Sequence, residues 1–172
     1  MNETISTLVG RVSTKKYLDK QVPDDLLDII LTAGLNAPSG LHNQKIYAVA
    51  VRNKETRDLL SRLNASVMGA ENDPFYGAPC VVVVLSDPEC NTWVENGSLM
   101  IGNMLNAATA LGVGSCWIHR AKEVFDMPEG KALLKKWGLS ESLRGVGNCI
   151  LGYPNGAPVP KERATDRIIK ID

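Results

Sequence analysis

The sequence has none of the long apolar runs that mark membrane or secreted proteins. Its apolar runs, such as 81–85, are far shorter than the ~20 residues needed to cross a bilayer, and residues 1–10 lack the apolar core of a signal peptide. It also lacks an excess of either charge, because nineteen basic residues balance nineteen acidic ones. A general attraction to nucleic acid or to an anionic membrane is therefore not expected. We predict a cytoplasmic protein that binds neither.

The sequence contains no closely spaced cysteines. The four are Cys80, Cys90, Cys116 and Cys149. Their wide and irregular spacing matches neither a Cys-x-x-Cys pair nor a zinc-ligand pattern, which disfavours a bound metal and a thiol-based redox protein. We expect free, mostly buried thiols.

The pattern of apolar residues predicts one α+β domain over residues 1–172, a length sufficient for a substantial core. Predicted strands cover 46–51, 80–85 and 145–153. The continuous β-branched run at 80–85 is typical of a central strand covered on both faces. Predicted helices begin after Pro23 and cover 54–63 and 128–139. Because helices and strands do not alternate strictly, we expect a mixed sheet flanked by helices.

The stretch 96–117 predicts a long helix that is apolar on nearly all sides. Asn96 is a suitable N-cap, and Gly112 with Gly114 marks the end of the helix. Both sides of such a helix need packing partners. In a chain of this size, we therefore expect it to lie at a subunit boundary.

A row of polar side chains precedes the first of these helices. Arg11, Ser13 and Lys15 lie two residues apart, so an extended segment would project them from one face. Guanidinium, hydroxyl and ammonium donors on one face can bind a phosphate and an adjoining polar group. Considered alone, the row is more typical of a solvated edge strand.

A rigid turn with many hydrogen-bonding groups follows that helix. Its candidate ligand-binding residues are Pro38, Ser39, His42, Asn43 and Gln44. Their donors and acceptors could pair with the imide edge of a heterocycle such as a flavin pyrimidine ring. The alternative is that Ser39 caps a helical turn and the amide side chains face water.

Two further segments could contact a ligand. Gly114 and Ser115 could present backbone N–H groups, although a glycine that only ends the helix explains the pattern equally well. The Gly112-Val-Gly114 sequence lacks a third glycine and follows a helix, which excludes a Rossmann fingerprint. Lys161 and Arg163 lie in a basic tail that needs an anionic partner or merely faces solvent.

Together these segments resemble the FMN-dependent nitroreductase family, and the resemblance runs from about residue 11 to residue 163. It rests on the order and spacing of several motifs. These are Arg11-Val-Ser13-Thr-Lys15-Lys-Tyr17, Ala37-Pro38-Ser39-Gly40 with Gln44, Asn103-Met104-Leu105, Ala107-Ala108, Leu111-Gly-Val-Gly114-Ser-Cys-Trp117, Leu151-Gly-Tyr-Pro154 and Lys161-Glu-Arg163. The resemblance implies a nitroreductase-like α+β homodimer with a mixed, mainly antiparallel sheet. Two FMN molecules would lie in clefts at the interface, each contacted by both subunits.

The resemblance also implies roles for individual residues. Arg11, Lys161 and Arg163 would bind the FMN phosphate, and Lys15 would face the pyrimidine edge, where a cation favours the reduced, anionic flavin. The other implied cofactor-binding residues are Val12 and Ser13 nearby, Pro38, Ser39, His42, Asn43 and Gln44 from the partner subunit, and Gly114 and Ser115 at the reactive edge. The tail, about 155–172, would pack near the cofactor or the partner.

The implied activity is that of an NAD(P)H-dependent FMN oxidoreductase. It would pass a hydride from NADPH or NADH through FMN to nitroaromatics, quinones or similar small electron-poor acceptors by a ping-pong mechanism. No catalytic side chain is implied, because the chemistry belongs to FMN. The alternative is a flavin-binding storage or redox-sensing protein with little turnover.

The chain departs from the family pattern at several positions. His42 stands where asparagine is usual, which leaves open whether His42 or Asn43 contacts the flavin. Asn96 stands where aspartate is common. The short segment 64–77 predicts a more open pocket than in larger members.

Overall fold

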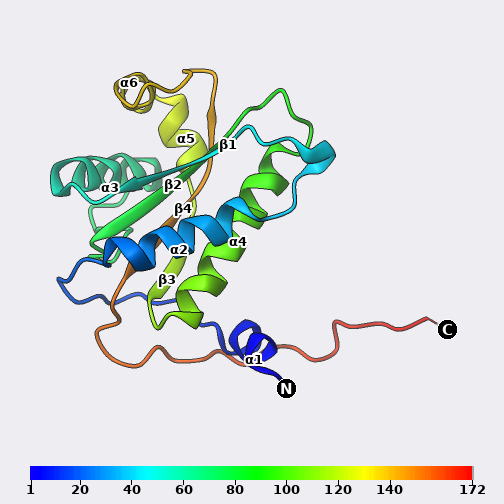
Figure 1. Ribbon diagram of the computed structural model, residues 1–172. Helices are drawn as coiled ribbons and strands as arrows, with labels where there is room; N and C mark the ends of the chain where they lie inside the picture. The colour runs from blue at the N-terminus through cyan, green and yellow to red at the C-terminus, as the bar shows by residue number, and fades with distance from the viewer. Residues whose placement is uncertain (172) are drawn as a thin grey trace.

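The computed structural model describes residues 1–171, which form one sheet with helices on both faces (Figure 1). The elements in chain order are α1 (Glu3–Gly10), α2 (Asp24–Leu35), η1 (Gly40–His42), β1 (Ile46–Val51), α3 (Lys54–Met68), β2 (Cys80–Ser86), α4 (Trp93–Ala110), β3 (Gly114–Ile118), α5 (Ala121–Asp126), α6 (Pro128–Lys136) and β4 (Arg144–Gly152). The predicted α+β class is confirmed.

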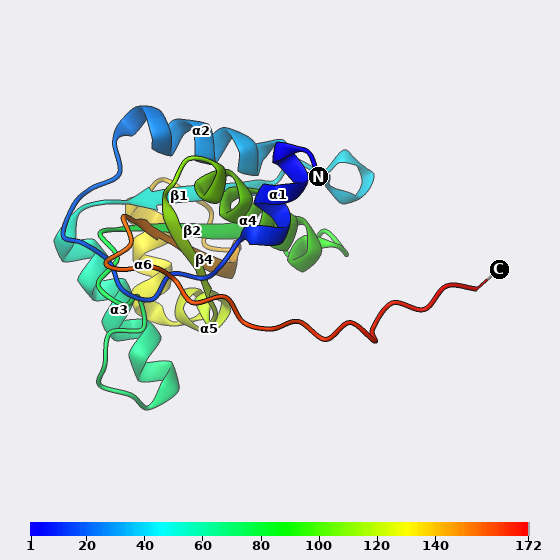
Figure 2. The same cartoon turned by 90° about the horizontal axis from the view of Figure 1, so that it is seen from below.

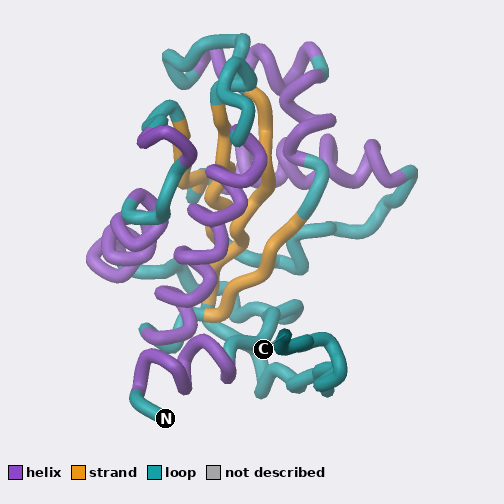
Figure 3. The backbone as a smooth tube through the Cα atoms, turned by 90° about the vertical axis from the view of Figure 1, so that its right-hand side faces the viewer, coloured by secondary structure: helices purple, strands orange, loops and turns teal. Residues whose placement is uncertain are grey.

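The four strands lie side by side in the order β1-β2-β4-β3, and each neighbouring pair is antiparallel (Figure 3). A single parallel bridge between Ser13 and Ser115 attaches the extended N-terminal segment beside β3. The four-stranded sheet is therefore antiparallel throughout, in line with the mainly antiparallel sheet that the family resemblance implies, and this bridge outside the strands is its parallel contact.

The central position predicted for β2 is also confirmed, since all seven of its residues are buried. Val81, Val83 and Leu85 belong to one apolar cluster, whereas Val82 and Val84 belong to another. Each face of β2 thus contributes to a separate half of the core. Helices α1, α2 and α4 lie on one side of the sheet, and α3, α5 and α6 lie on the other (Figure 2).

Helix α4 begins earlier than predicted. Thr92 occupies its N-cap position, and Asn96 is a buried residue within the helix, so the prediction that Asn96 caps it is wrong. The Asn96 side chain makes a tertiary contact instead of a cap: its Oδ1 accepts a hydrogen bond of 2.9 Å from the Gly40 N–H. The glycine stop is confirmed at Gly112, which has a φ of +69°.

The two sides of α4 differ in exposure. Met100, Ile101 and Met104 are buried against the sheet and α2. In contrast, Leu99 is 46% exposed and Val94 is 44% exposed. The helix therefore presents apolar surface that this chain does not cover.

Three elements were not expected from the sequence. They are α1, α5 and β3. Helix α1 has no buried residue, and an Asn2 side chain caps it by accepting from the Ile5 N–H. Strand β3 occupies residues expected to form a turn. Helix α3 also extends beyond its predicted end, to Met68.

Three of the cysteines, Cys80, Cys116 and Cys149, are buried, and Cys90 is partly exposed. The prediction of mostly buried thiols is confirmed. Within residues 1–171, no helix combines the length and hydropathy needed to span a bilayer.

Candidate functional site

The site begins with the extended segment 11–17, which is fixed beside β3. The Thr14 N–H donates to the Ser115 carbonyl at 2.9 Å, and the Asn155 N–H donates to the Lys16 carbonyl at 2.9 Å. Thr14 is buried, whereas Ser13 and Lys15 on either side of it are exposed. Ser13 and Lys15 therefore face solvent on either side of the buried Thr14, while Arg11 is half-buried.

Tyr17 strengthens this attachment. Its hydroxyl donates to the Thr14 carbonyl at 2.9 Å. Burial raises the pKa of the Tyr17 phenol well above its ordinary value, so the hydroxyl keeps the proton that it donates. Tyr17 thus holds the backbone of the segment in place.

A cavity of about 800 Å³ lies between this segment and the start of the C-terminal tail. Its lining is drawn from residues 9–16 and 155–163. It brings together Arg11, Val12, Ser13 and Lys15 with Lys161 and Arg163, six of the residues predicted to bind a cofactor. Figures 1 and 2 show these two parts of the chain side by side, before the tail extends away from the body.

The lining of this cavity is strongly cationic. It contains Arg11, Lys15, Lys16, Lys161 and Arg163, and no acidic residue. Within the described part of the chain, none of these five side chains forms an ion pair. Positive groups left without counter-charge around a cavity attract an anion, and the volume is typical of a site for a small molecule.

The second group of predicted residues, Pro38 to Gln44, lies elsewhere. Figure 1 shows this turn at the beginning of α4, whereas the segments that line the cavity, 9–16 and 155–163, lie near the end of α4. Leu41 and His42 both have left-handed backbones, with φ of 52° and 54°, and the Leu41 side chain is fully exposed. The turn is a protruding tip that does not reach the cavity of its own chain.

Side-chain contacts in this turn distinguish His42 from Asn43. Asn43 Oδ1 accepts from the Lys45 N–H at 2.9 Å, so this amide stabilises its own turn. His42 Nε2 lies 3.0 Å from Gln44 Nε2, and both side chains are exposed. His42 and Gln44 therefore remain accessible to a ligand or to another subunit.

Cys90 lies at the base of the turn. Its Sγ is 3.3 Å from Thr92 Oγ1 and 3.5 Å from Asn96 Nδ2. Hydrogen bonds hold the pKa of the Cys90 thiol below its ordinary value, and the bond with the Thr92 side chain has the largest effect. These contacts and the Asn96–Gly40 bond connect the turn to the first turns of α4.

Gly114 and Ser115 occupy β3, directly beneath the segment 11–17. A Cβ at Gly114 would lie 2.8 Å from Thr14 Oγ1 and 3.0 Å from Pro154 Cγ, so glycine is required here for close packing of the chain itself. Ser115 Oγ is buried and has no hydrogen-bond partner within the described chain.

Sequence reasoning did not anticipate Tyr76 as part of this region. The Lys15 ammonium lies 5.5 Å from the centroid of the Tyr76 ring. The two residues are distant in sequence, and Tyr76 belongs to a glycine- and proline-punctuated loop. An aromatic residue in such a loop was the only available signal.

The fold is that of an α+β protein, and its cationic cavity, which is partly open to solvent, has the charge and size suited to a small anionic ligand. The chain belongs to the nitroreductase family, whose sequence model matches residues 8–74 and 66–153.

Individual relatives agree with this assignment. A protein of Archaeoglobus fulgidus, provisionally named an NADH dehydrogenase/NAD(P)H nitroreductase, is 30% identical over 160 residues, which are 90% of this chain and 87% of the relative. An NAD(P)H FMN reductase of Bacillus subtilis is 28% identical over 95% of this chain and 70% of its own length. The crystal structure of a Bacteroides fragilis nitroreductase with bound FMN is 31% identical, covers all of both chains and has a TM-score of 0.91.

Proposed function

We propose that this chain is an FMN-dependent oxidoreductase that oxidises NADPH or NADH and reduces small electron-poor acceptors such as nitroaromatics and quinones. The observation that carries the proposal is the cationic cavity without counter-charge, in a fold shared with an FMN-bound nitroreductase. The names of the relatives, which include an NAD(P)H FMN reductase, support the electron donor.

The residues of the cavity fit the phosphate of FMN. Arg11, Lys161 and Arg163 lie around one space, and guanidinium groups bind phosphate oxygens in pairs. Ser13 adds a hydroxyl donor from the same segment, and Val12 lines the cavity between them. These side chains bind and orient the cofactor, while FMN, when bound, supplies hydride transfer between the donor and the acceptor in a ping-pong sequence.

Lys15 has a different role in this proposal. It lies two residues beyond Ser13 on the same exposed face, so it would reach the pyrimidine edge of a flavin whose phosphate is held by Arg11. A cation at this edge stabilises the negative charge of reduced flavin and raises its reduction potential.

A second subunit is needed to complete the site. Helix α4 has 18 residues and is therefore about 27 Å long, with the Pro38–Gln44 turn at its beginning and the segments that line the cavity near its end. A two-fold axis near the middle of α4 would bring the turn of one subunit beside the cavity of the other. In such a homodimer, Pro38, Ser39, His42 and Gln44 would contact the partner's flavin, and Asn43 would stabilise the turn.

The remaining predictions keep their status as proposals. Gly114 and Ser115 would lie at the reactive edge of the flavin, and the unpartnered Ser115 hydroxyl supports a ligand nearby. Residues 1–172 would act as one cytoplasmic domain, with the tail from about 155 near the cofactor or the partner. Asp172, the end of that tail, lies outside the described residues. The open pocket predicted from residues 64–77 also remains a prediction.

The experiment that tests this function is reduction of the purified protein without air. NADPH or NADH should bleach the flavin absorbance, and a nitroaromatic or a quinone should then restore it. A flavoprotein that neither nucleotide bleaches would instead be the storage or sensing protein, and the proposed enzyme would be excluded.

A further inference from the structure

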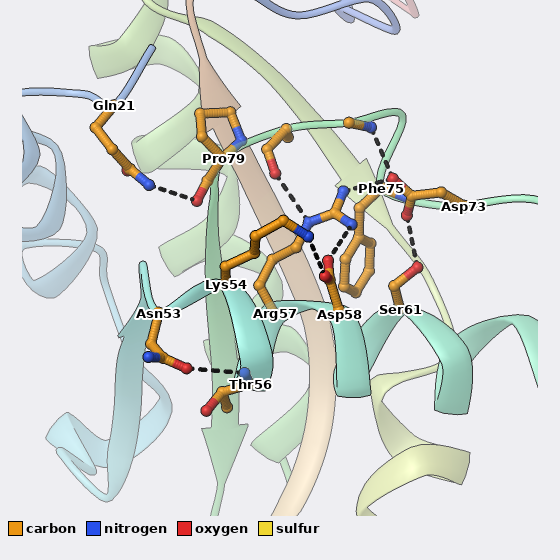
Figure 4. A network of polar contacts seen from close by, with 12 residues as sticks. Gln21, Asn53, Lys54, Thr56, Arg57, Asp58, Ser61, Asp73, Phe75 and Pro79 are labelled. Carbon is orange, nitrogen blue, oxygen red and sulfur yellow. Dashed lines mark hydrogen bonds and ion pairs between the residues drawn. The ribbon is translucent and has the colours of Figure 1, made fainter. Parts of the chain in front are cut away.

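One carboxylate, that of Asp73, organises the loop between α3 and β2 (Figure 4). Its Oδ1 accepts from Ser61 Oγ at 2.6 Å and from the Phe75 N–H at 2.9 Å. Its Oδ2 accepts from the Gly77 N–H at 2.8 Å and from the Arg57 guanidinium. Four donors from helix and loop thus converge on Asp73 and fix the turn 73–77.

Arg57 anchors the same turn from beneath. Its side chain is only 11% exposed, and its Nε donates to the Ala78 carbonyl at 3.0 Å. The guanidinium also lies 5.6 Å from the ring centroid of Phe75, which is 1% exposed. The loop is therefore tied to α3 at both ends of the turn.

The consequence of this anchoring is the conformation of Tyr76. Its φ is +53°, a left-handed value that is unfavourable for an aromatic residue and persists only where the surroundings enforce it. This conformation directs the ring toward the extended segment 11–17. The Lys15 ammonium lies 5.5 Å from the ring centroid, within the range of a cation–π contact.

The Tyr76 ring lies beside a Lys15 side chain that has no carboxylate partner in the described part of the chain. Within residues 1–171, Lys15 forms no ion pair with a carboxylate. The backbone on either side of Lys15 is fixed by the Thr14 and Lys16 hydrogen bonds to Ser115 and Asn155. The long side chain would otherwise be free to move in solvent.

We propose that Tyr76 is a positioning residue that holds the Lys15 ammonium at the flavin, and that the Arg57–Asp73 pair acts by fixing Tyr76. The inference rests on the proposed function, in which Lys15 faces the pyrimidine edge. A lysine held in one place stabilises the reduced flavin more than one that samples many positions, because the interaction falls with distance and with exposure to water. Tyr76 thereby contributes to the reduction potential.

The direct test is the midpoint potential of the FMN-loaded protein, measured by spectroelectrochemical titration. Tyr76→Leu should lower the potential, whereas Tyr76→Phe keeps the ring and should leave it unchanged. In a Lys15→Met background, Tyr76→Leu should give no further decrease. An unchanged potential in Tyr76→Leu would overturn the inference. So would a decrease on Tyr76→Leu that is as large in the Lys15→Met background as in the wild type.

A second measurement does not depend on the cofactor. In protein labelled with carbon-13 lysine and stripped of FMN, the Lys15 Cε resonances should show a ring-current shift that Tyr76→Phe keeps and Tyr76→Leu loses. Asp73→Asn should reduce this shift in the same direction. If the protein binds no FMN, the proposed function fails. If FMN binds and Tyr76→Leu changes neither the potential nor the lysine resonances, the positioning role of Tyr76 fails.

Discussion

At the residue scale, charge pairing distinguishes the arginines that could bind a ligand from those that stabilise the fold. Arg11 and Arg163 line the cavity without a carboxylate partner within the described residues, whereas Arg57 and Arg144 pair with Asp73 and Asp126. The first two are available to an anion, and the second two are already neutralised.

Arg11→Ala and Arg163→Ala should each give folded protein with weak FMN binding. Each change removes a charge-assisted phosphate contact of about 1.5–3 kcal/mol, which corresponds to a roughly 10- to 150-fold increase in the FMN dissociation constant. Fluorescence titration of the FMN-free protein with FMN measures this dissociation constant. Arg167→Ala is the matched control, because Arg167 lies outside the cavity, is exposed and pairs with the adjacent Asp166. Unaltered FMN affinity in Arg11→Ala would contradict the phosphate assignment.

Asp73 should make stability depend on acid pH. Burial opposes its charged form, but the hydrogen bonds from Ser61, Arg57, Gly77 and Phe75 outweigh burial and hold the pKa of Asp73 below its usual value. The folded state therefore binds this proton less tightly than the unfolded state does. The resulting stability is present above the unfolded pKa, near 3.9, and is lost as the pH falls through the folded pKa.

The variant Asp73→Asn should lose about 1–3 kcal/mol of unfolding free energy at pH 7, because the mostly buried Arg57 loses one of its two carboxylate partners and keeps only Asp58, at 3.2 Å. Urea denaturation at pH 7 and at pH 3 measures this. The difference between variant and wild type should shrink at the lower pH. A difference that stays constant between the two would show that Asp73 does not carry the pH dependence.

At the element scale, the beginning of α4 determines the conformation of the protruding turn. Asn96 is 2% exposed and supplies the acceptor for the Gly40 N–H. Two consecutive left-handed residues, Leu41 and His42, follow directly. A backbone of this kind needs fixed neighbours, and the Asn96 contact is one of them.

Asn96→Leu should leave the Gly40 N–H without its acceptor and cost about 1–3 kcal/mol of stability. Amide hydrogen exchange at Gly40 should become faster, and thermal unfolding should occur at lower temperature. Asn96→Asp is the control, since it keeps an oxygen acceptor at the same place. Equal protection of Gly40 in wild type and Asn96→Leu would exclude this role for Asn96.

These elements also show how far the sequence could be read. The continuous run 80–85 was sufficient to predict a central strand, because only a strand buried on both faces lacks polar alternation. Strand β3 was missed because it is short and begins at Gly114, only two residues after Gly112, so that Gly114 was interpreted as part of the helix stop. Asn96 was misplaced because N-cap preference is local, whereas its partner Gly40 is 56 residues away.

The candidate site was predictable to a similar extent. The alternation of Arg11, Ser13 and Lys15 and the basic tail were visible as separate motifs, and the structure brings them around one cavity. The contact between Lys15 and Tyr76 could not be predicted, because it depends on a loop conformation that Asp73 and Arg57 enforce through long-range contacts.

At the scale of the whole molecule, the proposed homodimer would join two segments that lie apart within one chain. The Pro38–Gln44 turn and the segments that line the cationic cavity lie at opposite ends of α4. Leu99 and Val94, both on α4, are exposed to solvent. Burying this surface in a homodimer would remove apolar area from water and complete the site at the same time.

Leu99→Lys should therefore weaken both dimerisation and FMN binding, because a charge would be buried at the interface. Sedimentation at micromolar concentration should detect the monomer. Met68→Lys is the matched control, since Met68 is 42% exposed at the end of α3, on the opposite side of the sheet. If wild-type protein is itself monomeric with FMN bound, the two-subunit cleft is wrong.

The most direct test of the central claim is the identity of the cofactor released from the purified protein. Acid release followed by absorbance and mass measurement should give a flavin spectrum, the mass of FMN and about one FMN for each chain. Arg11→Ala should release much less FMN than the wild type while it remains folded. A protein that releases no flavin and takes up none when FMN is added would contradict the account.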